Sequence, residues 1–356
     1  MRSGANVGQC AIYLEDSPAI SMSDTLIIQS GDLNPFFLTI FLNTKHGKAL
    51  IERGKYGSAQ PHIAPPFLYQ IPGPSWEHLQ TEIEKTYLRS KELTELSKTR
   101  CAETQILLLS ELGLADWQPK HTLAFATDYA SMQRAERIDA DYFQPKYEDI
   151  EKGIRNYSNG HTSIRNEFEQ NTSIFEIEPE KLYRYVEIGS VNVSTGEIVE
   201  EEVLGKDLPA NAKRVLKKGD IVISKVRTYR GAITVIQEDG YVGSGAFCVL
   251  RENGKIDKET LLACLRSKLF LTWSWKPNTG TSYPTLDDDD ILDFPIPILP
   301  KEKQSGIKQN VDESFNLRKR AKDLLECAKR AVEIAIEQDE QTAIDWLASV
   351  SQVIDA

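Results

Sequence analysis

The chain has 356 residues, 40% of them hydrophobic, and a formal net charge of −11. This length fits two domains, or two copies of one domain with connecting segments. No apolar run reaches the roughly 18–20 residues that a membrane span needs, and the N-terminus lacks the layout of a signal peptide. The five cysteines and five histidines are scattered without metal or redox spacing, so a reducing, cytoplasmic location is expected. The acidic charge argues against nucleic acid unless a local basic face survives.

One stretch of the sequence occurs twice, at a constant offset of 223 residues. A Gly-Ser/Thr-x-x-Pro loop is followed by a Pro-x-Pro segment and then by a long helical pattern. The matching segments are residues 57–61 and 71–74 in the first copy and residues 280–284 and 294–297 in the second. Residues 2–74 align with residues 225–297 at this offset without a gap. Because the repeat is longer than a solenoid unit, it indicates a duplicated domain plus helix.

Each copy is interpreted as the same small α/β unit, with two strands followed by a helix. The expected elements are residues 8–14, 24–29 and 35–52 in the first copy and residues 231–237, 246–251 and 258–274 in the second. The first helix starts at Asn34-Pro35-Phe36-Phe37, which is close to the Asn-Pro-Pro-Tyr loop of amino-methyltransferases but lacks its second proline. We interpret this segment as a helix N-terminus with proline near its first position.

A long helix follows each copy. Residues 76–112 predict a helix of about 37 residues, roughly 55 Å long, that ends at Gly113. Its apolar stripe consists of Leu79, Ile83, Tyr87, Leu93 and Leu96. Over residues 301–340, apolar residues recur with the seam spacing of a coiled coil, at Ala321, Leu325, Ala328, Val332 and Ala335. Alanines and Ser97 in the seam allow a close approach, so a long helix pair is favoured over two ordinary amphipathic core helices.

The second copy carries further strands in front of the repeated part. Strands are predicted at residues 183–188, 197–203 and 220–224, with a turn at Ser194-Thr195-Gly196. These segments have no counterpart before the first copy. We therefore expect a whole domain over residues 116–300 and a first domain that lacks about 110 residues at its front.

Catalytic and metal motifs find no support in the sequence. No Gly-rich cofactor loop follows a strand, and no GxxxxGK[ST] motif or Ser/His/Asp or Cys/His grouping stands out. The four aspartates at residues 287–290 align with Ala-Pro-Pro-Phe in the first copy, so a solvated loop or helix cap is favoured over a metal site. Asp139 and Asp141 are compatible with a hydrolytic metal site, but no third carboxylate or lysine lies at a persuasive spacing. No catalytic, cofactor-binding or metal-binding residue is predicted.

One basic segment stands out in the acidic chain. Seven cations and an interleaved tyrosine fall within 18 residues, namely Lys213, Arg214, Lys217, Lys218, Lys225, Arg227, Tyr229 and Arg230. The predicted strand at 220–224 lies inside this segment, so its last four residues would be presented from a strand end or loop. Arginine and lysine there suit DNA phosphates and guanine edges, and the alternative is a solvated rim. In the first copy Arg2 corresponds to Lys225, whereas Gly4, Asn6 and Val7 replace the other three.

Taken together, these residues resemble the specificity (S) subunit of type I restriction–modification systems. The resemblance covers nearly the whole chain and rests on the repeated loop, the Ile/Phe-Pro-x-Pro segments before the long helices, and residues 107–114, 137–147 and 219–227. It implies an α/β (α+β) fold in which target-recognition domains of mixed strands and helices are separated by two long helices forming an antiparallel coiled coil. The implied divisions are a partial first target-recognition domain (1–75), a spacer helix (76–115), a complete second target-recognition domain (116–300) and a C-terminal spacer helix with a tail (301–356).

The resemblance also implies a function. The chain would be a non-catalytic DNA sequence recognition subunit that reads part of a bipartite target and docks methyltransferase (modification) and restriction subunits. The eight residues of the basic segment would contact double-stranded DNA, while S-adenosylmethionine and ATP would bind the partner subunits and not this chain. The alternatives are a scaffold subunit of a defence complex that has lost two-half-site specificity and, less favoured, a metal-dependent nuclease that uses Asp139 and Asp141.

Overall fold

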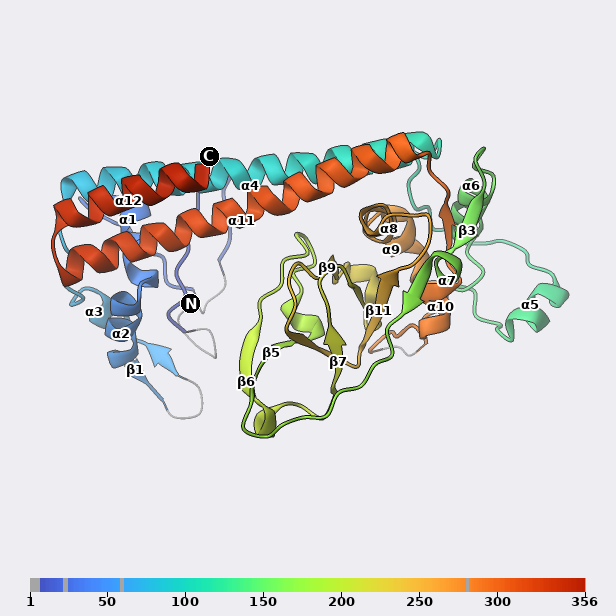
Figure 1. The fold of residues 1–356 in the computed structure, drawn as a ribbon, viewed down its shortest axis with the longest axis horizontal. Helices are drawn as coiled ribbons and strands as arrows, with labels where there is room; N and C mark the ends of the chain where they lie inside the picture. The colour runs from blue at the N-terminus through green and yellow to red at the C-terminus, as the bar shows by residue number, and fades with distance from the viewer. Residues whose placement is uncertain (1–6, 22–24, 58–60, 280–281, 356) are drawn as a thin grey trace. The chain divides into compact units, whose positions relative to one another are not determined.

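The computed structural model describes residues 7–21, 25–57, 61–279 and 282–355. Contacts between residues divide the chain into two compact units, and the division falls inside both long helices (Figure 1). Unit 1 consists of residues 1–97 and 314–356, and unit 2 consists of residues 98–313. Within the described ranges, no helix is both long and apolar enough to cross a membrane.

Unit 1 is mainly helical. It contains the first part of α4 (Glu77–Glu111), the last part of α11 (Lys301–Glu337), and the smaller elements α1 (Pro35–Asn43), α2 (Lys45–Arg53), β1 (Lys55–Tyr56), β2 (His62–Ile63), α3 (Pro65–Leu68) and α12 (Glu340–Asp355). Side chains from α1, α4, α11 and α12 share one apolar core, in which Phe37, Leu79 and Ile83 are buried. The long helices predicted from the sequence are confirmed. A separate α12 is not predicted; Asp339 starts it by accepting the backbone N–H of Thr342 (2.9 Å).

Within unit 1, α4 and α11 run antiparallel and approach closely. The Ser90 hydroxyl donates to the carbonyl of Ala321 (2.8 Å), and seven residues further along α4 the Ser97 hydroxyl lies 2.9 Å from that of Ser314. These small buried side chains permit a short distance between the helix axes, as predicted from Ser97. Leu96 was predicted to continue the apolar stripe of this helix, and that prediction is wrong. Ser97 faces α11 instead, and Leu96 is 39% exposed.

The end of α4, in unit 2, confirms Gly113 as its stop. The Leu114 N–H donates to the carbonyl of Leu109 (2.8 Å), and the Gly113 N–H donates to that of Ser110 (3.0 Å). This is a Schellman motif, and it requires a left-handed residue at Gly113, whose φ is 66°. Glycine adopts that conformation without the steric cost that a side chain brings.

Unit 2 contains two four-stranded sheets, ordered β6-β5-β10-β7 and β4-β11-β8-β9, and a short β12–β3 pair. Neighbouring strands are antiparallel except β5 and β10. The strands are β3 (His161–Ser163), β4 (Phe168–Gln170), β5 (Leu182–Val186), β6 (Glu201–Leu204), β7 (Ala212–Leu216), β8 (Ile221–Ser224), β9 (Ile233–Val235), β10 (Tyr241–Ser244), β11 (Phe247–Glu252) and β12 (Pro295–Pro297). The predicted strands match β5, β6, β8, β9 and β11, whereas β3, β4, β7, β10 and β12 are not predicted.

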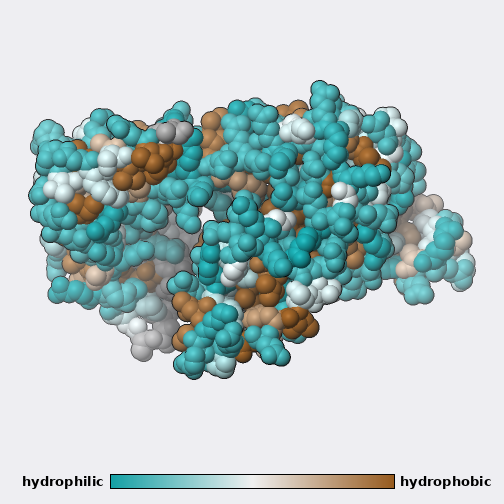
Figure 2. All heavy atoms as spheres, viewed as in Figure 1, coloured by the Kyte–Doolittle hydropathy of each residue, from teal (hydrophilic) through white to brown (hydrophobic). Residues whose placement is uncertain are grey.

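The main core of unit 2 draws apolar side chains from both sheets. Val186 and Leu216 from the first sheet meet Val222 and Phe247 from the second. The helical segments are α5 (Tyr129–Ala135), α6 (Pro145–Arg155), α7 (Ile164–Glu167), α8 (Lys258–Leu265), α9 (Lys268–Trp273), α10 (Asp288–Leu292), η1 (Ile188–Ser190), η2 (Gly205–Asp207) and η3 (Thr228–Arg230). Figure 2 shows a mainly hydrophilic face with apolar residues gathered over the β5–β7 part of unit 2.

The 223-residue repeat extends to individual hydrogen bonds. The predicted helices 35–52 and 258–274 are each broken in two, at Thr44 and at Ser267, which correspond at the same offset. Thr44 caps α2 by accepting the Gly47 N–H (3.0 Å) and donates to the carbonyl of Phe41 (2.6 Å). Ser267 caps α9 by accepting the Phe270 N–H (3.4 Å) and donates to the carbonyl of Cys264 (2.6 Å). Both hydroxyls are buried in the same role.

The loop after each helix pair repeats as well. Tyr56 pairs with His62 in unit 1, and Thr279 pairs with Thr285 at the corresponding positions of unit 2. The short helices α3 and α10 begin 223 residues apart. Residues 58–60 and 280–281, between the paired residues, lie outside the described ranges. The repeat is therefore structural as well as sequential.

The strands predicted in the first copy are not formed in the described residues. Residues 8–14 and 25–29 contain no strand, although the corresponding second-copy segments form β9 and β11. In unit 2 both strands bond to β8. A strand needs a hydrogen-bonded neighbour, so local propensity alone does not create one here.

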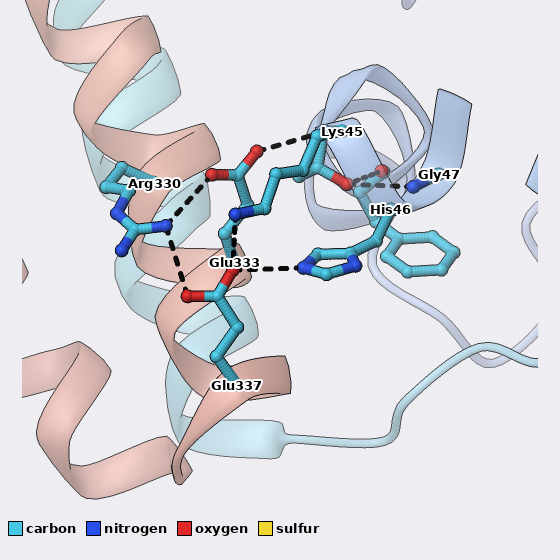
Figure 3. A network of polar contacts seen from close by, with 8 residues as sticks. Lys45, His46, Gly47, Arg330, Glu333 and Glu337 are labelled. Carbon is cyan, nitrogen blue, oxygen red and sulfur yellow. Dashed lines mark hydrogen bonds and ion pairs between the residues drawn. The ribbon is translucent and has the colours of Figure 1, made fainter. Parts of the chain in front are cut away.

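A polar network attaches the start of α2 to the end of α11 in unit 1 (Figure 3). Lys45 Nζ and His46 Nε2 lie 2.5 and 3.2 Å from the same carboxylate oxygen of Glu337. The backbone N–H of Lys45 donates to Glu333 (3.0 Å), and Arg330 pairs with both glutamates. Lys45 and His46 lower the pKa of Glu337 from 4.5 to about 2.

This network predicts a pH dependence of stability. Because the folded-state pKa of Glu337 is depressed, its contribution is present above about pH 4.5 and is lost as the pH falls toward 2. Glu337→Gln should therefore reduce the loss of stability over that window, measured by urea unfolding at a series of pH values. Glu180→Gln, at an exposed position of unit 2, is the control. Identical pH slopes for the chain and Glu337→Gln would contradict this assignment.

The two equivalent caps give a matched pair of stability predictions. Thr44→Ala and Ser267→Ala each leave a buried helix N-terminus without its side-chain acceptor, and each should lower the free energy of unfolding by about 1–2 kcal/mol. Ser349→Ala removes an exposed hydroxyl that bonds only within its own helix and should change it by less than about 0.5 kcal/mol. Urea unfolding followed by circular dichroism tests this. Equal effects of all three changes would rule out the capping role.

Candidate nucleic-acid interface

Strand β8 positions the predicted DNA-contacting residues. It is an inner strand between β11 and β9, and all four of its side chains are buried. Lys217 and Lys218 precede it and Lys225 follows it, so these residues lie at opposite ends of a strand roughly 13 Å long. The predicted set of eight therefore does not form one continuous row.

Strand β7 brings two earlier cations toward the end of β8. The Lys213 side chain lies against Gly245, and the Lys225 N–H donates to the carbonyl of Ala246 (2.9 Å), so both lysines flank the β10–β11 turn. Burial raises the pKa of the Cys248 thiol, and Lys225 and Arg214 oppose that rise, which places both cations near it. We call the residues collected at this end the exit group; they are Lys213, Arg214, Lys225, Arg227, Tyr229 and Arg230. Only the turn lysines, Lys217 and Lys218, lie apart.

Asp220 fixes the turn that holds Lys217 and Lys218. Its side chain is 0% exposed and forms two bonds with Arg251, at 2.8 and 3.0 Å. It also accepts the backbone N–H of Lys217 (2.9 Å). The one acid of the basic segment is thus a structural anchor for the start of β8.

The exit group is braced by the loop before α10. Lys225 Nζ lies 3.2 Å from Asp288, so its charge is compensated. Arg227 instead contacts neutral groups: its backbone N–H donates to the carbonyl of Pro284 (2.8 Å) and its Nη2 to that of Ser282 (3.0 Å). Its guanidinium carbon lies 4.8 Å from the ring centroid of Tyr283. The Arg227 guanidinium is therefore restrained by groups that do not neutralise its charge.

The other members of the exit group complete a mixed cationic and aromatic surface. Tyr229 stacks on Trp275, with ring centroids 3.9 Å apart and planes at 23°. Arg214 donates to the carbonyl of Thr172 (2.8 Å). Among the described residues, Lys213, Arg214, Arg227 and Arg230 have no carboxylate partner. Uncompensated cations beside aromatic rings suit a phosphate backbone and base edges.

The aspartates considered as metal ligands have structural partners. Asp287 and Asp290 form a capping box at the start of α10, which confirms the helix-cap interpretation. Asp289 pairs with Arg165 (2.7 Å). Asp139 is held by two bonds from Arg137, which keep the pKa of that carboxyl below its usual range. In the part of the chain that the structure describes, no three His, Cys, Asp or Glu side chains gather into a metal site.

The first copy supplies little to compare with the exit group. Arg2, Gly4 and Asn6 lie outside the described residues. Val7, which corresponds to Arg230, is buried in the apolar core of unit 1.

Sequence reasoning missed the residues that lie between the end of α9 and the start of α10. Tyr283, Trp275 and Asp288 all contact the exit group, yet they lie more than forty positions along the chain from it. The available signal was the loop itself, since residues 280–284 mark the repeat and binding residues are often carried by loops.

The anchor at Asp220 gives a stability prediction. Asp220→Asn keeps the size of the side chain but removes the charge that Arg251 binds, and it should lower the free energy of unfolding by about 2 kcal/mol, discounted for the partial exposure of Arg251. Asp239→Asn is the matched control, because Asp239 accepts the Lys218 N–H at an exposed site. Urea unfolding of both variants is the measurement. The anchoring role is wrong if the two variants lose the same stability.

Comparison with known proteins identifies the class of this domain. Residues 151–326 match the family model described as the type I restriction modification DNA specificity domain. This range includes both sheets' main strands and the whole basic segment. This part of the chain is therefore similar to the DNA specificity domain of type I restriction–modification systems, the family that the sequence resembles.

Two curated relatives carry that description. The type I restriction enzyme EcoDI specificity subunit of Escherichia coli is 26% identical over 121 residues, covering 34% of this chain and 27% of the relative. The HindI specificity subunit of Haemophilus influenzae is 30% identical over 129 residues, covering 33% of this chain and 28% of the relative. The chain thus spans about a quarter of the length of these relatives.

Two solved structures are also similar. The HsdS subunit from Thermoanaerobacter tengcongensis is 26% identical with a TM-score of 0.35, covering 50% of this chain and 45% of that chain. The type I restriction-modification system S subunit from M. genitalium is 15% identical with a TM-score of 0.39, covering 89% of this chain and 73% of that chain.

Proposed function

We propose that this chain is a non-catalytic subunit that recognises a DNA sequence for a type I restriction–modification complex in the cytoplasm. The observation that carries the proposal is the coincidence of the specificity-domain match, residues 151–326, with the uncompensated cations of the exit group. Their charges are held by β8 and by the loop at 282–284. Such cations contact phosphates for register and base edges for specificity.

The partner subunits belong to the same proposal. The long helices α4 and α11 would separate recognition elements and dock methyltransferase subunits, and the restriction subunit would join that complex. Reading of two half-sites would require a second recognition domain in the complex.

A selection experiment tests the reading function. The purified full-length chain, alone and with methyltransferase subunits, is incubated with randomised duplex DNA, and bound duplexes are recovered by gel shift and sequenced. An enriched motif supports sequence recognition. Binding to methyltransferase without enrichment would instead support a scaffold subunit. Metal-dependent cleavage by the isolated chain, lost in Asp139→Ala, would establish the nuclease alternative, against which the Arg137–Asp139 pair argues.

Arg227 provides the sharpest test of the interface. Arg227→Ala should weaken binding to the enriched motif by about 1–3 kcal/mol, because a base-reading arginine is worth that much. Alanine bears the same left-handed backbone cost as arginine at φ 51°, so the change isolates the side chain. Lys152→Ala removes one charge from an exposed pair within α6 and should leave affinity unchanged. Equal affinities for both variants in a titrated gel shift would remove Arg227 from the interface.

A further inference from the structure

Arg227 is held in an unusual backbone conformation. Its φ and ψ of 51° and 44° are left-handed, and only one other residue besides glycine has a positive φ in the described chain. A side chain makes this conformation costly, and such costs persist where the surrounding structure enforces them. Here the Arg227 N–H is bonded to Pro284, and Arg230 and Gly231 close the following turn back onto Arg227 and Thr228. The direction of the Arg227 side chain is therefore set by its backbone.

The loop at 282–284 also restrains the guanidinium. Ser282 accepts one N–H of Nη2, and the Tyr283 ring lies beside the guanidinium carbon at 4.8 Å. Among the described residues, Nη2 is the one guanidinium nitrogen with a hydrogen-bond partner. The remaining N–H groups are consequently left to donate elsewhere.

Packing in an apolar core does not explain the position of Tyr283. Its side chain is 68% exposed, whereas the adjacent Pro284 and Leu286 are buried and anchor the loop. The described contact of its ring is with Arg227. An exposed aromatic ring beside a half-buried arginine contributes little to stability, on the order of 0.5–1 kcal/mol. Its main physical effect is to limit the orientations of the guanidinium.

We infer that Tyr283 is a positioning residue that fixes the Arg227 guanidinium for a guanine edge in the major groove of duplex DNA. The inference rests on the proposed function. Arginine reads guanine by donating two N–H groups to O6 and N7, and this requires a defined guanidinium plane. A ring on one face and a carbonyl on one N–H define that plane before DNA binds, which reduces the ordering cost of recognition.

Selection from randomised duplex DNA with four full-length variants tests this inference. Arg227→Lys should lose preference for guanine at one position of the motif. Tyr283→Leu should lose at least about tenfold of the preference at that same position, whereas Tyr283→Phe, which retains the ring, should keep it. Tyr129→Leu changes another largely exposed tyrosine, in α5, and should leave the motif unaltered.

The outcomes separate this inference from the proposed function. If the unaltered chain enriches a motif and Tyr283→Leu retains every base preference, the inference fails and the proposed function stands. Loss in Tyr283→Leu at a position different from that of Arg227→Lys also overturns it. If the unaltered chain enriches no motif, both fail. Equal thermal midpoints for Tyr283→Leu and the unaltered chain exclude unfolding, and recovery in Tyr283→Phe assigns the effect to the ring.

Discussion

Backbone pairing of β8 is the constraint on which the candidate interface depends. β8 bonds to β11 on one side and β9 on the other, its four side chains are buried, and Val222 lies in the core between the sheets. A shift of one residue would move every side chain to the opposite face of the sheet, where it would not fit the existing packing. The segments at its two ends therefore have fixed positions. Lys225 and Arg227 leave the strand at one edge because the strand itself cannot move.

The same dependence explains how far the fold could be predicted. Helices and caps depend on local sequence, so the long helices, Gly113 and the helix positions of both copies could be predicted. The caps at Thr44 and Ser267 obey local rules too, although the breaks they make escaped notice. Strands depend on neighbours far along the chain. Residues 8–14 have the sequence pattern of β9 but form no strand, so the pattern alone was misleading.

The candidate site was also predictable only in its local features. A run of cations is visible in the sequence, and it indicated the segment that the specificity-domain match contains. The sequence did not show which cations have a carboxylate partner, because Asp288 lies 63 residues from Lys225 along the chain. Nor could the sequence show that Ser282 and Tyr283 restrain Arg227, since that contact spans 55 residues. The separation of the turn lysines from the exit group likewise follows from the strand between them.

Local compensation reconciles a net charge of −11 with the proposed DNA-contacting surface. Several carboxylates of unit 2 are bound by cations that lie outside the exit group. Asp220 is bound by Arg251, Asp289 by Arg165 and Asp139 by Arg137. Fields from such pairs fall off faster than those of single charges, and solvent ions screen the remainder beyond about 8–10 Å. In the proposed interface, a phosphate close to Arg227 and Arg230 is attracted by these two charges. Its repulsion by the more distant carboxylates of the chain is largely screened by salt.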